Sequence, residues 1–204
     1  MKRFLLISLM TIVAVLSFFI GLYFFFPKDV ALGYFWQKSV LAAAEKGITL
    51  ESAALTTEGT LSFHIVLRNV RIAAPLASAE ASVVRVIPLF LESVFSLAPT
   101  AEIHVETLTM TLPLPGQPPL VFSTFSSTGS VRSSGIRLSA IRSTGDLSIS
   151  GELTVNPNTA RLDEADLAIS GERAALLEYA KTMLPLKKEP SGGWTLKRTG
   201  GENK

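Results

Sequence analysis

The histidines and their acidic neighbours are the side chains best suited to bind a metal ion. Only two histidines are present, His64 and His104, and Glu106 follows His104 by two residues. Residues two apart on a strand project from one face, so this imidazole and this carboxylate can share a face. A zinc site needs three or four ligands at matching spacing, and the chain has no cysteine to supply them. We therefore expect two solvent-facing strand residues and no metal site.

A group of acidic residues offers oxygen ligands of the kind that calcium prefers. Asp163, Glu164 and Asp166 lie within four residues of one another. The group lacks the central glycine and the terminal glutamate of a calcium-binding EF-hand loop. We interpret it as a solvated turn.

Motifs for nucleophilic catalysis and for nucleotide binding are missing from the sequence. No serine stands in a Gly-x-Ser-x-Gly elbow, and no glycine-rich phosphate loop stands between a buried strand and a helix. With no converging acid, base, nucleophile or metal ligand, we predict a non-catalytic protein without a cofactor.

Length and charge restrict the protein to a small set of classes. The chain has 204 residues, enough for a membrane segment and one ordinary domain. Nineteen basic residues face 17 acidic ones, a formal net charge of +2. This balance gives no strong electrostatic field, so we expect no nucleic acid partner.

The N-terminal segment is long and strongly apolar. Residues 4–26 are 23 consecutive residues without a charged side chain. At about 1.5 Å per residue, a helix of this length spans a hydrocarbon core of roughly 30 Å. We predict that residues 1–27 form a cytoplasmic tip and an uncleaved transmembrane anchor. Its anchoring side chains are Phe4, Leu5, Phe18, Phe19, Phe24, Phe25 and Phe26.

Positive charges predict how this segment is oriented. Lys2 and Arg3 precede it and only Lys28 follows closely, which favours a cytoplasmic N-terminus and a domain outside the cytoplasm. The alternative is a signal peptide cleaved after small residues such as those at 31–33 or 42–44. Signal peptides usually have only about 7–15 apolar residues, so the length favours an anchor.

A juxtamembrane helix is predicted over residues 28–47, with Gly47 as its stop signal. Tyr34, Phe35 and Trp36 would place aromatic rings near the bilayer surface, where such rings are enriched. The sequence leaves two interpretations open: the helix rests on the lipid surface, or it packs against the domain that follows.

Residues 48–185 have the pattern of a β-rich domain, because apolar and polar residues alternate and glycines separate the runs. The alternation changes parity at Thr107, where we predict a β-bulge. Short helices are predicted over 87–96 and 172–184 from apolar residues at helical spacing. Residues 186–204 are polar and glycine-rich; disorder is the default prediction, with an edge strand at 194–196 as the alternative.

Several segments resemble a known family. They are LRNVRI at 67–72, AEASVVRV at 79–86, IHVETL at 103–108 and GDLSISGEL at 145–153. Together they resemble the N-terminal part of AsmA-like proteins, a group that includes the type II secretion system protein N family. The resemblance implies a cell inner membrane protein with one transmembrane helix and a periplasmic domain. That domain would be a curved antiparallel sheet, an open or taco-like groove with an apolar inner face and two or three short helices.

The resemblance also implies a function. We expect a non-catalytic accessory or scaffold protein of type II secretion, whose partners are other secretion-system or cell-envelope proteins bound at exposed strand edges. The alternative is an AsmA-like lipid-binding or lipid-transfer module that takes membrane lipids into its apolar groove, and dense packing of that face would exclude it. The groove residues would be Ile136, Leu138, Leu147, Ile149 and Leu153.

Overall fold

Most of the predicted membrane anchor, residues 1–27, lies outside the residues that the structure describes. Phe4, Leu5, Phe18, Phe19, Phe24, Phe25 and Phe26 all belong to the part that is not described. Among the described residues, no helix combines the length and hydropathy needed to cross a bilayer. The anchor therefore stays a prediction. In this computed structural model the described residues are 13–14, 17, 28–59, 64–75, 77–112, 116–133, 135–156, 161–181, 185–190 and 192–199.

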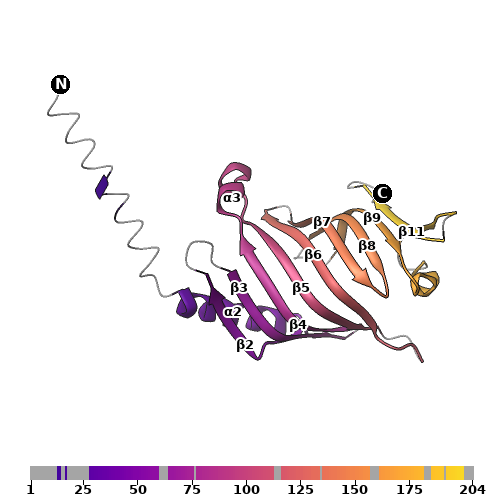
Figure 1. Ribbon diagram of the computed structural model, residues 1–204, viewed down its shortest axis with the longest axis horizontal. Coiled ribbons are helices and arrows are strands. Elements are labelled where there is room, and N and C mark those ends of the chain that lie inside the picture. Colours follow the sequence, from indigo (N-terminus) through magenta and orange to yellow (C-terminus); the bar gives the residue numbers. More distant parts are fainter. Residues whose placement is uncertain are drawn as a thin grey trace, which may run out of the picture.

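The alternating segments form one antiparallel sheet of 11 strands, and the prediction of a mainly β domain with a meander is confirmed. From β3 to β9 each strand pairs with the next one along the chain, while β1 and β2 both pair with β3 (Figure 1). The strands are Thr49–Glu51 (β1), Ala54–Glu58 (β2), His64–Ala74 (β3), Ala77–Pro88 (β4), Thr100–Thr111 (β5), Leu120–Arg132 (β6), Gly135–Gly145 (β7), Ser148–Asn156 (β8), Arg161–Ser170 (β9), Leu186–Lys188 (β10) and Trp194–Arg198 (β11).

The helices are short and agree with the predicted places. Helix α2 spans Lys28–Ala44 and ends in a turn that closes at Gly47, whose φ is +72°. Helix α3 spans Phe90–Ser96 and starts later than predicted, because Ile87 and Pro88 still pair with β5. In the predicted helix over 172–184, the described residues form a 3₁₀ turn, Ala174–Leu176 (η1), and a short helix, Leu177–Ala180 (α4).

The C-terminal segment contributes two strands where disorder was the default prediction. β11 pairs with β9 and β10 pairs with β11, so β11 lies inside the sheet and not at its edge. Trp194 of β11 is only 1% exposed. The burial of this indole and of Leu196 stabilises β11 in the sheet. In the sequence, the lysines and glycines around these two residues mask the apolar signal.

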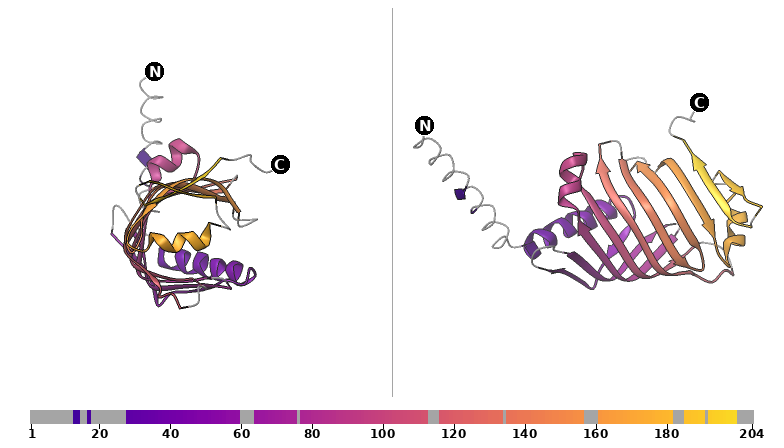
Figure 2. Two further views of the ribbon diagram at one scale, coloured as in Figure 1. Left: turned by 90° about the vertical axis from the view of Figure 1, so that its right-hand side faces the viewer. Right: turned by 45° about the horizontal axis from the view of Figure 1, so that its top comes forward.

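The sheet curls into a trough, the name used below for its concave face. In the left view of Figure 2 the strands form an arc that is open on one side, with α2 and η1–α4 on the concave side. Trp36 of α2 packs against the cluster around Leu67, Val70 and Ala81 at one end of the trough. At the other end, Ala174 of η1 joins the larger cluster that contains Leu147, Trp194 and Leu196. Helices therefore close both ends of the trough.

A crease crosses the sheet where the predicted bulge was placed, but its form differs from that prediction. Thr107 has a φ of +51°, and Val105 and Leu108 on either side of it both pack on the concave side. The pairing of β5 with β4 and β6 nevertheless keeps its register through Thr107. Asn69 of β3, with φ +50°, occupies the same row, because Asn69 faces Ser82 and Ser82 faces Thr107. Neighbouring strands change the alternation of inward and outward side chains at the same row, so the sheet needs no additional, bulged residue there.

A polar latch holds together three loops on one rim of the trough. Arg173 donates from Nη1 to the carbonyl of Pro119 at 2.6 Å and from Nη2 to that of Pro118 at 2.8 Å. The same guanidinium lies 3.2 Å from Asp146 Oδ2, which also accepts a hydrogen bond from the Val121 amide at 2.9 Å. The Val121 amide, with help from Arg173, holds the pKa of Asp146 below its ordinary value of 3.8.

Because the latch depends on the ionised carboxylate of Asp146, we expect the protein to lose stability in acid. The pKa of Asp146 is lower in the folded protein than in the unfolded chain. The ionised carboxylate therefore contributes its full stabilisation above the unfolded pKa, and this stabilisation is lost as the pH falls through the unfolded and then the folded pKa. We expect the melting temperature of the native chain to fall more steeply than that of Asp146→Asn between about pH 5 and about pH 3. Thermal denaturation by circular dichroism measures this. The exposed neighbour Glu172→Gln is the control and should keep the native slope.

Candidate functional site

The residues first considered for metal binding are engaged in separate contacts on the convex outer face. His104 Nε2 lies 3.4 Å from Glu102 Oε2, whereas Glu106 accepts a 2.7 Å hydrogen bond from Arg85. His64 lies on β3, at the start of that strand. Across the described ranges, no three His, Cys, Asp or Glu side chains gather as metal ligands would. The arrangement is one of cross-strand ion pairs on an exposed sheet face.

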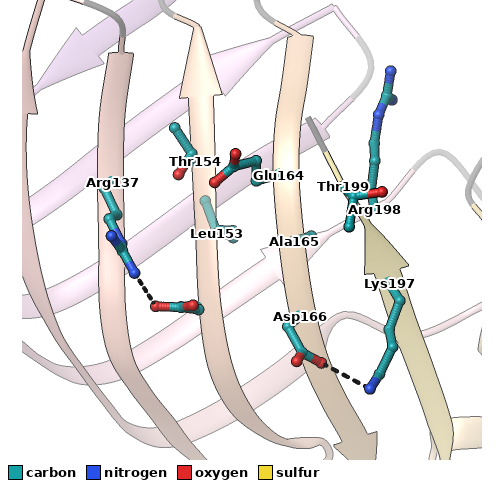
Figure 3. Close-up of a pocket in the computed structure, with 10 residues that line it drawn as sticks. Arg137, Leu153, Thr154, Glu164, Ala165, Asp166, Lys197, Arg198 and Thr199 are labelled. Atoms are coloured by element: carbon teal, nitrogen blue, oxygen red, sulfur yellow. Dashed lines mark hydrogen bonds and ion pairs between the residues drawn. The ribbon is translucent and has the colours of Figure 1, made fainter. Parts of the chain in front are cut away.

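The acidic group at 163–166 is part of β9, so its interpretation as a solvated turn is wrong. Glu164 and Asp166 are exposed on the outer face, where they face β8 on one side and β11 on the other. They contribute to a hollow of about 380 Å³ that also includes Arg137 and Lys197 (Figure 3). Turn prediction failed because the charges alternate with Ala165 and Leu167, which are buried on the concave side.

In this outer hollow two acidic strands, β8 and β9, lie between two basic ones, β7 and β11. Arg137 Nη2 donates to Glu152 Oε2 at 2.6 Å, and Lys197 Nζ lies 3.7 Å from Asp166 Oδ1 (Figure 3). The hydrogen bond that Arg137 donates to Glu152, and then the negative charge of Glu152, raise the pKa of Arg137 above the ordinary value. Paired and solvated charges of this kind contribute little to stability, but they present both signs to a polar partner surface.

The predicted groove residues share the trough but differ in burial. Leu147 is packed in the larger cluster, and Leu138, Ile149 and Leu153 pack against it. Ile136 instead lines, with Leu138, an open apolar hollow of about 640 Å³ beside α3. In the structure this apolar face has a packed part and an open part, and a role of these residues in binding lipid stays a prediction.

Two apolar hollows remain in the trough. One, of about 280 Å³, lies beneath Trp36 and is lined by side chains such as Leu67 and Val105. The other is the 640 Å³ hollow, which falls in the range of small-molecule sites at roughly 300–1,000 Å³. Next to it, Ser127 faces Ile103 across the strand pair, and its buried hydroxyl has no hydrogen-bond partner among the described residues.

The aromatic residues predicted to lie at the bilayer surface point in two directions. Trp36 packs into the trough, whereas Tyr34 and Phe35 are exposed and contact each other edge to face at 6.0 Å. Lys38 Nζ lies 4.9 Å above the Tyr34 ring. Helix α2 therefore packs on the domain through Trp36 and leaves Tyr34 and Phe35 exposed, and contact of this helix with lipid stays a prediction.

By its fold the domain is one curved antiparallel sheet with an apolar trough and an outer face of paired charges. A family model described as type II secretion system protein GspN-like, Synergistales, matches residues 3–198. The chain belongs to this GspN-like family. The resemblance to type II secretion protein N is thereby confirmed, while the wider AsmA-like assignment stays a prediction. No match was found among curated proteins or among solved structures.

Proposed function

We propose that this chain is a membrane-anchored accessory protein of type II secretion, with its β domain on the periplasmic side of the inner membrane. Membership of the GspN-like family is the observation that carries this proposal. The anchor and its orientation rest on the uncharged run at 4–26 and on the basic residues before it. The absence of assembled catalytic groups among the described residues is consistent with a non-enzymatic role.

The outer face is the best surface for a secretion-system partner. The free edges of the sheet are short: β1 and β10 have three residues each, β2 has five, and β10 carries Lys187 and Lys188. Short edges, and lysines on an edge, resist the addition of another strand. The outer hollow offers exposed side chains of both charges, including Glu164 and Lys197, and mixed charges of this kind provide partner specificity. We therefore place the contact there and not at the strand edges expected from sequence.

A secretion assay with charge reversal tests this proposal. In the native host, loss of the chain should lower export of type II substrates, and Glu164→Arg combined with Asp166→Arg should reproduce most of that loss. Circular dichroism should show an unchanged fold, because both side chains are exposed. Gln117→Arg, an exposed loop change elsewhere, is the matched control and should secrete normally. Normal export without the chain would refute the role.

The lipid-handling alternative has one observation in its favour, the open 640 Å³ apolar hollow with the unpartnered Ser127 hydroxyl beside it. An acyl chain would fit the apolar walls, and an ester oxygen would accept a hydrogen bond from the Ser127 hydroxyl. If phospholipid remains on the purified chain in a stoichiometric amount and is lost in Leu138→Glu, this function gains support over the scaffold role.

A further inference from the structure

Among the described residues of the β domain, the most exposed apolar side chains belong to helix α3 and to Leu97, the residue that follows it. Helix α3 lies in the connection from β4 to β5 and stands clear of the strand ends (Figure 1). Leu91 is 75% exposed, Phe95 86% and Leu97 93%, and no residue of α3 is buried. Isolated exposed apolar residues are common, but several large ones in one short helix mark an interaction surface.

The chemistry of this tip favours lipid over a protein partner. Between Pro88 and Ala101 the only charged residue is Glu92. A stable protein interface needs roughly 800 Å² on each side and about 20–30 residues, whereas a helix of seven residues is only about 10 Å long. A small apolar tip does suit the bilayer interface, where side chains enter to a depth of roughly 5–10 Å.

The position of α3 brings it to the same rim as the predicted anchor. Thr57 Oγ1 of β2 donates to Asp29 Oδ1 at 2.7 Å, which fixes the start of α2 at this end of β2. Thr57 faces Ile65, and Ile65 faces Val86, so these residues form one row across three strands. Phe90, the first residue of α3, is only four residues beyond Val86. Two strand spacings amount to about 10 Å, so the start of α2, which follows the predicted anchor in sequence, lies on the same rim as α3.

A basic residue lies next to the tip. The Val131 amide donates to the carbonyl of Pro99, the residue just before β5, at 3.0 Å. This bond places the exposed Arg132 beside α3. A guanidinium at that position can contact the phosphate of an anionic lipid while the apolar side chains enter the hydrocarbon.

We propose that α3 is a second membrane contact, which inserts Leu91, Phe95 and Leu97 into the interface of the bilayer that holds the anchor. This inference rests on the membrane anchoring in the proposed function. A single attachment point does not define the orientation of the β domain relative to the membrane. Two contacts on one rim fix the direction in which the trough extends from the bilayer. The second insertion is intramolecular once the anchor is in place, so a small apolar tip suffices.

Single cysteines test the insertion, because the native chain has none. The full chain is prepared with a spin label at Phe95→Cys, Ile20→Cys or Ser148→Cys and reconstituted into phosphatidylethanolamine and phosphatidylglycerol vesicles. Accessibility to oxygen and to a water-soluble nickel chelate reports immersion. We expect the oxygen-to-nickel ratio at 95 to be several-fold higher than at the exposed residue 148, which lies on the opposite rim. The ratio at 20, inside the anchor, should also be high.

The other outcomes separate the two proposals. A high ratio at 20 with a water-like ratio at 95 would leave the anchor standing and overturn the insertion of α3. Water-like ratios at both positions would remove the anchoring on which the inference depends. Spin–spin broadening at 95 that disappears on dilution with unlabelled chain would show that a second copy covers α3, which also overturns the inference. Leu91→Glu should return the label at 95 to the ratio found at 148, with an unchanged circular dichroism spectrum.

Discussion

Replacing Trp194 with alanine should lower the free energy of unfolding by about 3–5 kcal/mol, the usual cost of removing a large buried aromatic side chain. The Trp194 side chain is among the most completely buried in the described structure, at 1% exposure. Trp194 lies opposite Ile169 of β9 and Lys188 of β10. The Nζ of Lys188 lies 5.6 Å from the centroid of the indole ring. The cavity would therefore open at the point where β11 joins the larger cluster.

Thermal denaturation in detergent micelles, followed by circular dichroism, measures this effect. At about 2–4 °C per kcal/mol for a chain of this size, the melting temperature should fall by about 10 °C. Phe95→Ala removes a comparable aromatic side chain that is 86% exposed, so it should shift stability by less than about 0.5 kcal/mol. A Trp194→Ala variant as stable as Phe95→Ala would mean that β11 does not contribute to the core.

The strands were predictable because their burial is one-sided. Alternation through segments such as 63–67 and 147–155 requires a sheet with one apolar face, and the glycines between runs indicate short connections. The trough residues Leu138, Leu147 and Leu153 followed from the same period. Periodicity reports only which face is buried. It does not report which part of that face other elements cover, so the division into packed and open regions needed the structure.

The crease could not be predicted from one strand considered alone. The parity change at Thr107 was visible in sequence as apolar residues spaced by three instead of two. Leu67 and Val70 on β3 and Ala81 and Val84 on β4 have the same spacing. A bulge in one strand explains one change of alternation. When paired strands all change their alternation in the same row, the register is kept and the whole sheet bends. Which strands pair cannot be read from any single strand.

The outer face and the C-terminal strands were harder to predict for a different reason. The ion pairs of the outer hollow join residues far apart in sequence, for example Arg137 with Glu152 and Asp166 with Lys197. Nothing in the sequence alone therefore indicates that these residues pair. In β11 the apolar signal consists only of Trp194 and Leu196, between lysines and glycines that favour disorder. Burial by η1 and β9 outweighs that local preference.

Replacing Gly151 with alanine should destabilise the protein by about 3 kcal/mol or more. Gly151 has a φ of +133°, in a region that essentially only glycine occupies, and strain there costs about 1–3 kcal/mol. A Cβ at this position would also lie 2.0 Å from the carbonyl oxygen of Asp166 on β9. That oxygen belongs to the backbone, so relief requires β8 and β9 to separate, and overpacking of this kind typically costs a further 1–3 kcal/mol, roughly.

Gly33→Ala is the matched control, because Gly33 is inside helix α2 and a Cβ there would meet no atom within 4 Å other than the backbone of its own helix. Alanine there should leave stability unchanged or raise it by up to about 1 kcal/mol. Urea denaturation of both variants gives the comparison, and hydrogen exchange should show the loss of protection concentrated at the amides that join β8 to β9. If Gly151→Ala unfolds at the native urea concentration, β8 and β9 cannot approach each other as closely as described. The outer hollow, which spans these strands, would then have a different geometry, so this variant also tests the surface assigned to the secretion partner.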